Sequence, residues 1–239
     1  MIGRFHEVSV HAPDLLASLA FYERLGFSQV TTGEAFPYPY AVVADGRLAI
    51  GLHGRELPQS PLLSFVLPGL LDRLPALERR GIEILEQRLG GDVFNQAYLE
   101  AGGQRLRLLE ARTHSPSPLG PGETSRLGWF EEYALPVSEL KQAGAAFERL
   151  GFVPAEEGDD PYPRIGLTSD SLNVALLGPG TLARPALVFS DAEMPARIAK
   201  LRESGVAFAR RLPAGLDAGR HALLVAPEGT QLLLATSDT

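Results

Sequence analysis

The sequence contains no cysteine, so disulfide bonds, thiolate metal ligands and cysteine nucleophiles are excluded. It also has no apolar run near the roughly 20 residues that a membrane-spanning helix needs, and its first residues lack the apolar stretch of a signal peptide. Its net charge is −7, and no run of lysine and arginine offers a surface for nucleic acid or anionic lipid. We therefore expect a soluble, cytoplasmic protein with no nucleic-acid or membrane partner.

A strand, a turn and a helix are predicted at the start of the chain, in residues 5–27. Val8 and Val10 alternate with polar residues, which is typical of a strand with one buried face. Asp14 follows a proline and suits the N-cap of a helix, and Gly26 suits the left-handed residue that ends it. Short alternating runs after Gly26 predict three further strands, which gives a βαβββ unit.

The same pattern returns in residues 130–152, and both copies end in Glu-Arg-Leu-Gly-Phe. A Pro-Tyr-Pro loop also recurs, with Tyr38 and Tyr162 at its centre, and each copy is followed by a second predicted unit of strand, helix and strands. In the first of these second units, Pro75 predicts a helix that starts late or kinks. We predict an α+β fold of four βαβββ modules, paired into two cupped mixed sheets with the helices outside.

Residues 113–125 are rich in serine, proline and glycine and have neither helical nor strand periodicity. This composition predicts a linker. We therefore expect a first domain over residues 1–112, a linker over 113–125 and a second domain over 126–239, each domain with two modules.

The segment Ser-Leu-Ala-Phe-Tyr-Glu-Arg-Leu-Gly-Phe at residues 18–27, after a strand and an Asp/Pro turn, resembles the vicinal oxygen chelate superfamily. This superfamily includes glyoxalase I, bleomycin-resistance proteins, fosfomycin-resistance enzymes and extradiol dioxygenases. The turn at residues 226–230 resembles its Asp-Pro-Asp-Gly-Asn hairpin less closely. The resemblance, with the internal repeat, covers nearly the whole chain outside the linker and is specific for fold rather than for reaction.

The resemblance also implies three positions for the ligands of a divalent metal ion, one on each of three strands. Each half of this chain has a carboxylate at one of these positions and no ligand at the other two. The residues are Glu7, Leu62 and Arg107 in the first half and Glu132, Ala186 and Leu233 in the second. Leucine and alanine have no ligating atom, and a guanidinium has no lone pair to offer. We therefore expect no metal or other cofactor.

A Glu7–Arg107 ion pair is the arrangement that we predict in place of the metal. Alternation places Glu7, Ser9 and His11 on the face away from the helix, and it places Arg107 on the same face of the last strand of that half. The alternative is a solvated strand face, on which the same charges would lie apart. The predicted ligand-binding residues of the first cup are therefore Glu7, Ser9, His11 and Arg107, with Glu132 in the second cup.

Histidines and tyrosines leave further alternatives open. His11 and His53 with Glu7 would form a non-standard metal site, or the histidines are scattered at strand ends. Tyr38 and Tyr162, each between two prolines, would form aromatic edges to the two cups, or would pack against the ends of the sheets.

Three functions compete at this point. The leading interpretation is a metal-free protein, similar to glyoxalase and bleomycin-resistance proteins, that binds a small polar or aromatic molecule in a cup. The second is a lyase, isomerase or dioxygenase that uses a divalent metal ion held by Glu7, His11 and His53. The third is a non-catalytic scaffold with filled cups, and whether the protein is an enzyme stays open. Four modules can complete both cups within one chain, so either a monomer or a homodimer is compatible with the sequence.

Overall fold

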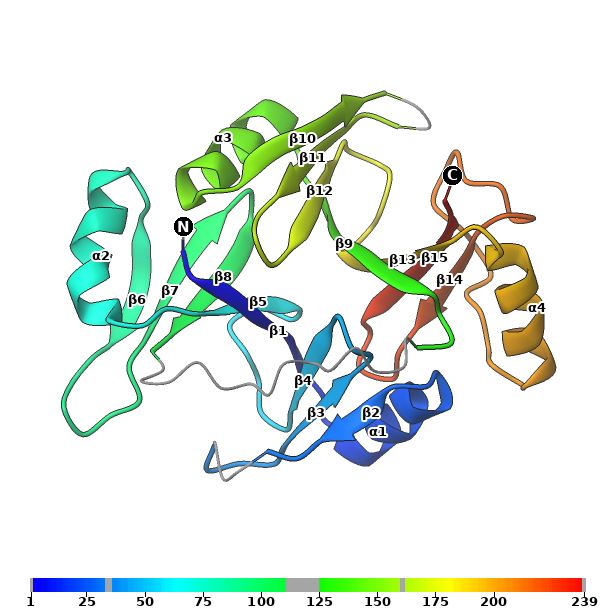
Figure 1. Ribbon diagram of the computed structural model, residues 1–239, viewed down its shortest axis with the longest axis horizontal. Coiled ribbons are helices and arrows are strands. Elements are labelled where there is room, and N and C mark those ends of the chain that lie inside the picture. Colours follow the sequence, from blue (N-terminus) through cyan, green and yellow to red (C-terminus); the bar gives the residue numbers. More distant parts are fainter. Residues whose placement is uncertain (1, 33–35, 111–124, 160–161, 238–239) are drawn as a thin grey trace.

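The computed structural model describes residues 2–32, 36–110, 125–159 and 162–237, and in these residues it contains two mixed β-sheets and four α-helices. The helices lie toward the outside of the molecule and the longest strands run through its middle (Figure 1). The helices are α1 (Leu15–Arg24), α2 (Leu70–Arg79), α3 (Leu140–Leu150) and α4 (Met194–Glu203). None of the helices in the described ranges is long and apolar enough to cross a membrane.

The first half of the chain forms an eight-stranded sheet with the order β2-β3-β4-β1-β5-β8-β7-β6. Its strands are β1 (Arg4–His11), β2 (Ser28–Val30), β3 (Tyr40–Ala44), β4 (Ala49–His53), β5 (Leu62–Val66), β6 (Ile84–Arg88), β7 (Gln96–Ala101) and β8 (Gln104–Leu109). The two modules of this half meet where β1 and β5 pair in antiparallel orientation.

The second half forms a seven-stranded sheet with the order β10-β11-β12-β9-β13-β15-β14. Its strands are β9 (Trp129–Pro136), β10 (Val153–Gly158), β11 (Arg164–Thr168), β12 (Asn173–Leu177), β13 (Ala186–Asp191), β14 (Ala222–Val225) and β15 (Gln231–Thr236). The pairing of β9 with β13 repeats that of β1 with β5, so the predicted α+β fold of two paired mixed sheets is confirmed.

The fourth module differs from the predicted βαβββ pattern. All of residues 204–221 are described, and they contain no strand between α4 and β14. Pro213 lacks the N–H that a sheet needs, and glycines at 215 and 219 weaken a strand further. Leu212 and Leu216 of this segment pack instead against the apolar residues of the second sheet.

Helix α1 begins and ends where the sequence predicts. The Asp14 carboxylate accepts a hydrogen bond from the Ala17 N–H at 3.0 Å, and Gly26 has a φ of 89°. Helix α2 does not start late, because its range of residues 70–79 includes Pro75. The proline removes the bond to the carbonyl of Leu71, and Leu71 is exposed, so water can solvate that carbonyl. Residues 113–124 of the predicted linker lie outside the described residues.

The helix-facing sides of the two sheets share one hydrophobic core. Phe27 and Phe189, from different halves, meet edge to face at 6.2 Å between ring centroids. At the same junction Ser18 and Tyr22 of α1 donate hydrogen bonds of 2.7 and 2.6 Å to the Glu228 carboxylate in the β14–β15 turn. The two halves are therefore joined by both apolar packing and partly buried hydrogen bonds.

Strand alternation turns the remaining side chains to the opposite face of each sheet. In β1, Val8 and Val10 belong to the shared core, so Glu7 and Ser9 lie on the other face. We call this face of the eight-stranded sheet, around Glu7, the first cup. The corresponding face of the seven-stranded sheet, around Glu132, is the second cup.

Candidate functional site

The Glu7 carboxylate lies at the centre of the first cup and is only 1% exposed. Its Oε1 atom accepts a hydrogen bond from the Ser9 hydroxyl at 2.6 Å, and its Oε2 atom accepts one from the Tyr40 hydroxyl at 2.6 Å. Oε1 also lies 3.2 Å from His53 Nε2 and 3.4 Å from Arg107 Nη2. The predicted Glu7–Arg107 ion pair is therefore present, and it is part of a buried network rather than a solvated strand face.

Arg107 is held by the same strands that hold Glu7. Its Nη2 atom donates to the Ser9 hydroxyl at 2.8 Å and its Nε atom donates to the Ser64 hydroxyl at 3.0 Å. The two hydroxyls are themselves 2.8 Å apart. Since β5 lies between β1 and β8, Ser64 connects the carboxylate strand to the guanidinium strand. Buried charges need such partners, because an unsatisfied buried polar group is costly.

Gly51 provides the space that the Glu7 carboxylate occupies. It lies on β4 directly opposite Ser9, and a Cβ atom at this position would collide with all three atoms of the Glu7 carboxylate group. The absence of a side chain at residue 51 is therefore a condition for burying the carboxylate here.

The electrostatics of the network fix the protonation of its members. Burial acts to raise the pKa of the Glu7 carboxyl, but the hydrogen bond from His53 and the charges of His6 and Arg107 outweigh it and hold this pKa well below its usual range. Burial lowers the pKa of the His53 imidazole, although Glu7 opposes this effect. At neutral pH the carboxylate is thus ionised and the imidazole neutral, and the pair Glu7–Arg107 has no net charge.

The tautomer of His53 follows from these partners. Nε2 must hold the proton that it donates to the ionised Glu7 carboxylate, so Nδ1 is the acceptor. Nδ1 lies 3.0 Å from the Tyr38 hydroxyl, which therefore donates to it. A continuous chain of hydrogen bonds runs from Tyr38 through His53 to Glu7.

The Phe36 ring covers this network. It stacks on Tyr38 at 5.1 Å between centroids and 22° between planes, and it meets Tyr40 and His53 edge to face at 4.8 and 5.3 Å. The Arg107 guanidinium lies 5.9 Å from its centroid. We call this ring the Phe36 plug, because it packs against three aromatic side chains beside the buried charges.

The second cup has a different lining at the equivalent positions. The strand registers match Ser9, Gly51, His53, Ser64 and Arg107 with Ala134, Ala175, Leu177, Val188 and Leu233. Those five residues are buried and apolar. Glu132 matches Glu7 and pairs with Arg164 at 2.9 Å, nearer the surface, and burial raises the pKa of the Glu132 carboxyl despite this arginine.

The structure thus gathers some of the predicted site residues and separates others. Glu7, Ser9 and Arg107 are in direct contact, and Tyr38 joins them through His53. His11, at the end of β1, is half-buried, and its backbone N–H donates to Ser60, but its imidazole is not part of the network. In the second cup Tyr162 packs against the apolar cluster, and in the described residues its hydroxyl has no hydrogen-bond partner.

Several members of the network were not singled out from the sequence. Ser64 alternates with Leu63 and Phe65, so its face was predictable, but its place opposite Glu7 depends on an irregularity of register between residues 5 and 7. Leu62, which the family resemblance places at one of the three metal-ligand positions, lies opposite Ser9 rather than Glu7. Phe36 and Tyr40 adjoin the Pro-Tyr-Pro loop, and only the fold brings them to the carboxylate.

A divalent metal ion does not fit the side chains around Glu7. Across the part of the chain that the structure describes, no three His, Cys, Asp or Glu side chains gather as a metal-ligand group, and the His11 imidazole lies outside the network around Glu7. Glu7 and His53 are two potential ligands, but the Arg107 cation lies 3.4 Å from the carboxylate and would repel a metal ion bound there.

No family model and no curated protein matches this chain. Solved structures do match. One is the homoprotocatechuate 2,3-dioxygenase from Brevibacterium fuscum in complex with 3,4-dihydroxyphenylacetate, at 17% identity and a TM-score of 0.65, over 99% of this chain and 81% of that one. The 2,3-dioxygenase LapB from Pseudomonas sp. KL28 has 14% identity and a TM-score of 0.66, over 99% and 92% of the two chains. A mutant 4-hydroxymandelate synthase from Streptomyces coelicolor has 15% identity and a TM-score of 0.61, over 99% and 94%. At these identities the similarity shows the fold alone.

Proposed function

We propose that this chain, which has the fold of the vicinal oxygen chelate superfamily, binds a small uncharged aromatic molecule in its first cup without a metal ion. In this respect it would be similar to the bleomycin-resistance-like and other sequestering members rather than to the metal enzymes. The observation that carries the proposal is the buried network of Glu7, Arg107 and His53, which the second cup does without.

The second cup serves as an internal control for what the fold requires. Five of its equivalent positions are apolar and well buried, so the fold does not need the polar side chains that the first cup contains. Replacing a buried ion pair by apolar residues is often neutral or stabilising, so such a pair is not explained by stability alone. Perturbed buried ionisable groups cluster at functional sites, which supports a function in the first cup.

The lining indicates the class of ligand. Glu7 and Arg107 neutralise each other and His53 is neutral, so a charged ligand would bring an unpaired charge into a buried site. The Phe36 ring now packs against the Tyr38, Tyr40 and His53 rings beside them. An aromatic ring that displaces the Phe36 plug would make the same contacts, and a polar substituent would reach the network below.

Titration with p-cresol and with indole, followed by amide chemical shifts, tests this proposal. We expect saturable shifts around Glu7, Tyr38 and His53. Because the plug must leave before the ligand enters, Phe36→Ala should raise the affinity several-fold, as expected when a competent state becomes more populated. A matched change in the second cup, Tyr162→Ala, should have no effect. If the Phe36→Ala variant binds neither compound, the result favours the alternative of a non-catalytic scaffold with filled cups.

The metal-dependent alternative has its own measurement. Elemental analysis of the purified protein, together with Glu7→Gln and His53→Gln, should show no stoichiometric divalent ion in any of the three proteins. A stoichiometric ion that both substitutions remove would favour a lyase, isomerase or dioxygenase instead.

We further propose that residues 1–112 and 126–239 are two domains joined by residues 113–125, and that the protein is cytoplasmic. Both cups are built within one chain, which supports a monomer, and a homodimer is the alternative. Light scattering at two protein concentrations distinguishes these states.

A further inference from the structure

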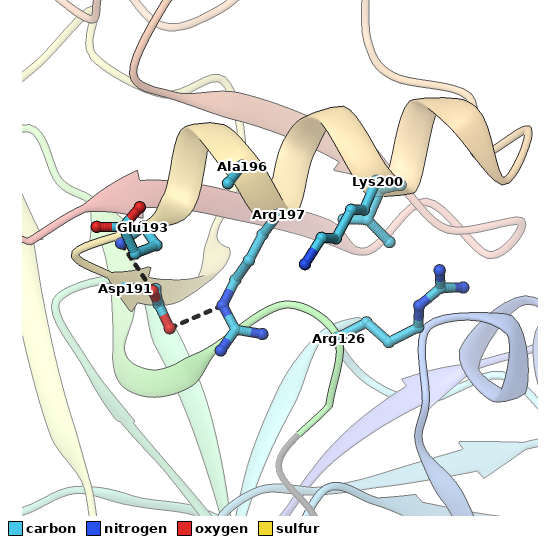
Figure 2. Close-up of a pocket in the computed structure, with 7 residues that line it drawn as sticks. Arg126, Asp191, Glu193, Ala196, Arg197 and Lys200 are labelled. Carbon is cyan, nitrogen blue, oxygen red and sulfur yellow. Dashed lines mark hydrogen bonds and ion pairs between the residues drawn. The ribbon is translucent and has the colours of Figure 1, made fainter.

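A cavity with a volume of about 350 Å³ lies outside both cups, between α4 and the segment that leads into β9. Arg126 comes from that segment, and Arg197 and Lys200 come from α4 (Figure 2). Asp191 and Glu193, just before the helix, line its other end, and Ala196 and Leu201 provide apolar contact. The cavity is at the lower end of the size range of small-molecule sites.

Positive charge in the cavity exceeds negative charge. Asp191 is already committed, since its Oδ2 atom accepts from Arg197 Nε at 2.7 Å and its Oδ1 atom accepts from the Glu193 N–H at 2.8 Å. Arg126 and Lys200 form no ion pair with any carboxylate within the described residues. In Figure 2 the Lys200 and Arg197 side chains point into the space beside the Arg126 segment. This excess of positive charge is a local feature, because the chain as a whole has a net charge of −7.

The equivalent corner of the first half has fewer charged side chains. Gly3 and Gly128 are equivalent, because each lies against the last residues of the neighbouring strand, Val66 in one half and Ser190 in the other. By the same register Asp191 corresponds to Leu67, which is apolar and buried, and Glu193 and Lys200 correspond to Gly69 and Ala76. The charged cavity is therefore not a requirement of the fold.

The structure fixes Arg126 against the other half of the chain. Its backbone N–H donates to the Leu25 carbonyl at 2.8 Å, and its Nη1 atom donates to the Arg24 carbonyl at 3.2 Å, both at the end of α1. Arg24 in turn donates to the Gly205 carbonyl just beyond α4. Arg126 is thus anchored on one side of the cavity, and the rest of its guanidinium group remains available on that side.

We propose that this cavity is a binding site for a small molecule that carries an oxyanion, either a phosphate or a carboxylate group. Guanidinium groups bind both kinds of oxyanion through paired N–H donors, and an ammonium group adds a third donor. The three cations of the lining exceed its two carboxylates by one charge, and Arg126 and Lys200 are the cations without an ion-pair partner among the described residues. Arg197 supplies its remaining N–H groups, and Ala196 and Leu201 contact the apolar part of the ligand. This proposal is independent of the function proposed for the first cup.

The chain has only two lysines, Lys141 and Lys200, which makes a selective test practicable. Reductive methylation with ¹³C labels both side chains and leaves their charge unchanged. Titration with phenyl phosphate, and separately with benzoate, should then shift the Lys200 signal in a saturable manner. Lys141, exposed on α3, should not respond. A response to either compound supports the oxyanion site, and the stronger response identifies the preferred group.

Charge-matched variants complete the test. Arg126→Gln should weaken binding by about three- to tenfold, because one charge-assisted contact is lost. Arg73→Gln, at the position on α2 that corresponds to Arg197, removes the same charge from the protein and should leave the affinity unchanged. Equal, non-saturating shifts of both lysine signals, or equal weakening by the two variants, would overturn the proposal. Absence of any shift with both compounds would also overturn it.

Discussion

The two cups of this protein are built on the same strands in the same register, yet their linings differ. Around Glu7 the first cup contains hydroxyl, imidazole and guanidinium groups, and all of them are bonded to one another. Around Glu132 the second cup has an apolar cluster, and its carboxylate pairs with a single, partly exposed arginine. The same sheet face is therefore lined by polar side chains in one half of the chain and by apolar side chains in the other. Only the polar lining of the first cup has a candidate function.

The largest expected difference between the cups comes from breaking each ion pair. Arg107→Leu introduces the side chain that the second cup has at this position, but it leaves the Glu7 carboxylate buried without its cation. We expect a loss of about 3–5 kcal/mol in the free energy of unfolding, measured in urea. Arg164→Leu should cost about 1 kcal/mol or less, since its pair is partly solvated. Equal losses would contradict the asymmetry of the two cups.

The two glutamates should also respond to pH in opposite directions. The pKa of Glu7 is below its ordinary value of 4.5 in the folded state, so its contribution to stability is fully present above pH 4.5 and is lost as the pH falls below it. The pKa of Glu132 is raised, so the folded state holds this proton longer and stability declines as the pH rises above 4.5 toward the folded pKa.

Glu7→Gln and Glu132→Gln test these signs when unfolding is followed across this pH range. The stability advantage of the wild type over Glu7→Gln should shrink on acidification, and its advantage over Glu132→Gln should grow. The same slope for both variants would show that the two carboxylates have similar environments.

Gly51 and Ala175 offer a comparison of space. Gly51→Ala places a methyl group where the Glu7 carboxylate lies, and we expect a loss of about 1–3 kcal/mol from overpacking. The converse change, Ala175→Gly, should cost about 0.5–1 kcal/mol, the typical effect of glycine in a strand. Thermal unfolding of both variants measures the difference. If Gly51→Ala leaves the stability unchanged, the Glu7 carboxylate can adopt another position.

The smallest effect concerns the two tyrosines of the Pro-Tyr-Pro loops. Tyr38→Phe removes the hydroxyl that donates to His53 and should cost about 0.5–1.5 kcal/mol. Tyr162→Phe should be neutral, because its hydroxyl has no partner among the residues that the structure describes. Urea unfolding of both proteins provides the comparison, and a larger loss for Tyr162→Phe would contradict it.

The sequence was informative where the relevant forces are local. Alternation placed Glu7 and Arg107 on one face, and the Asp14 cap and the glycine at 26 gave the limits of α1. Both kinds of inference depend on neighbouring residues only. The internal repeat and the family resemblance then predicted how the sheets are paired.

The remaining features depend on contacts between distant segments. The irregular register between β1 and β5 brings Ser64 rather than Leu62 opposite Glu7, and no local pattern reveals such a shift. The Phe36 plug contacts His53 on a separate strand, and only the folded chain brings these two rings together. The irregular segment of residues 204–221 keeps its place by covering the apolar second cup, although the repeat predicted a strand there.

Converting the first cup into the second tests the central claim most directly. The six substitutions are Ser9→Ala, Tyr40→Arg, Gly51→Ala, His53→Leu, Ser64→Val and Arg107→Leu, each of which introduces the residue of the second cup. Tyr40 is included because the strand registers match it with Arg164. We predict a folded protein whose unfolding free energy is within about 2 kcal/mol of the wild type and which no longer responds to p-cresol or indole. A protein that fails to fold, or that folds and still binds these compounds, would contradict a functional role for the polar network.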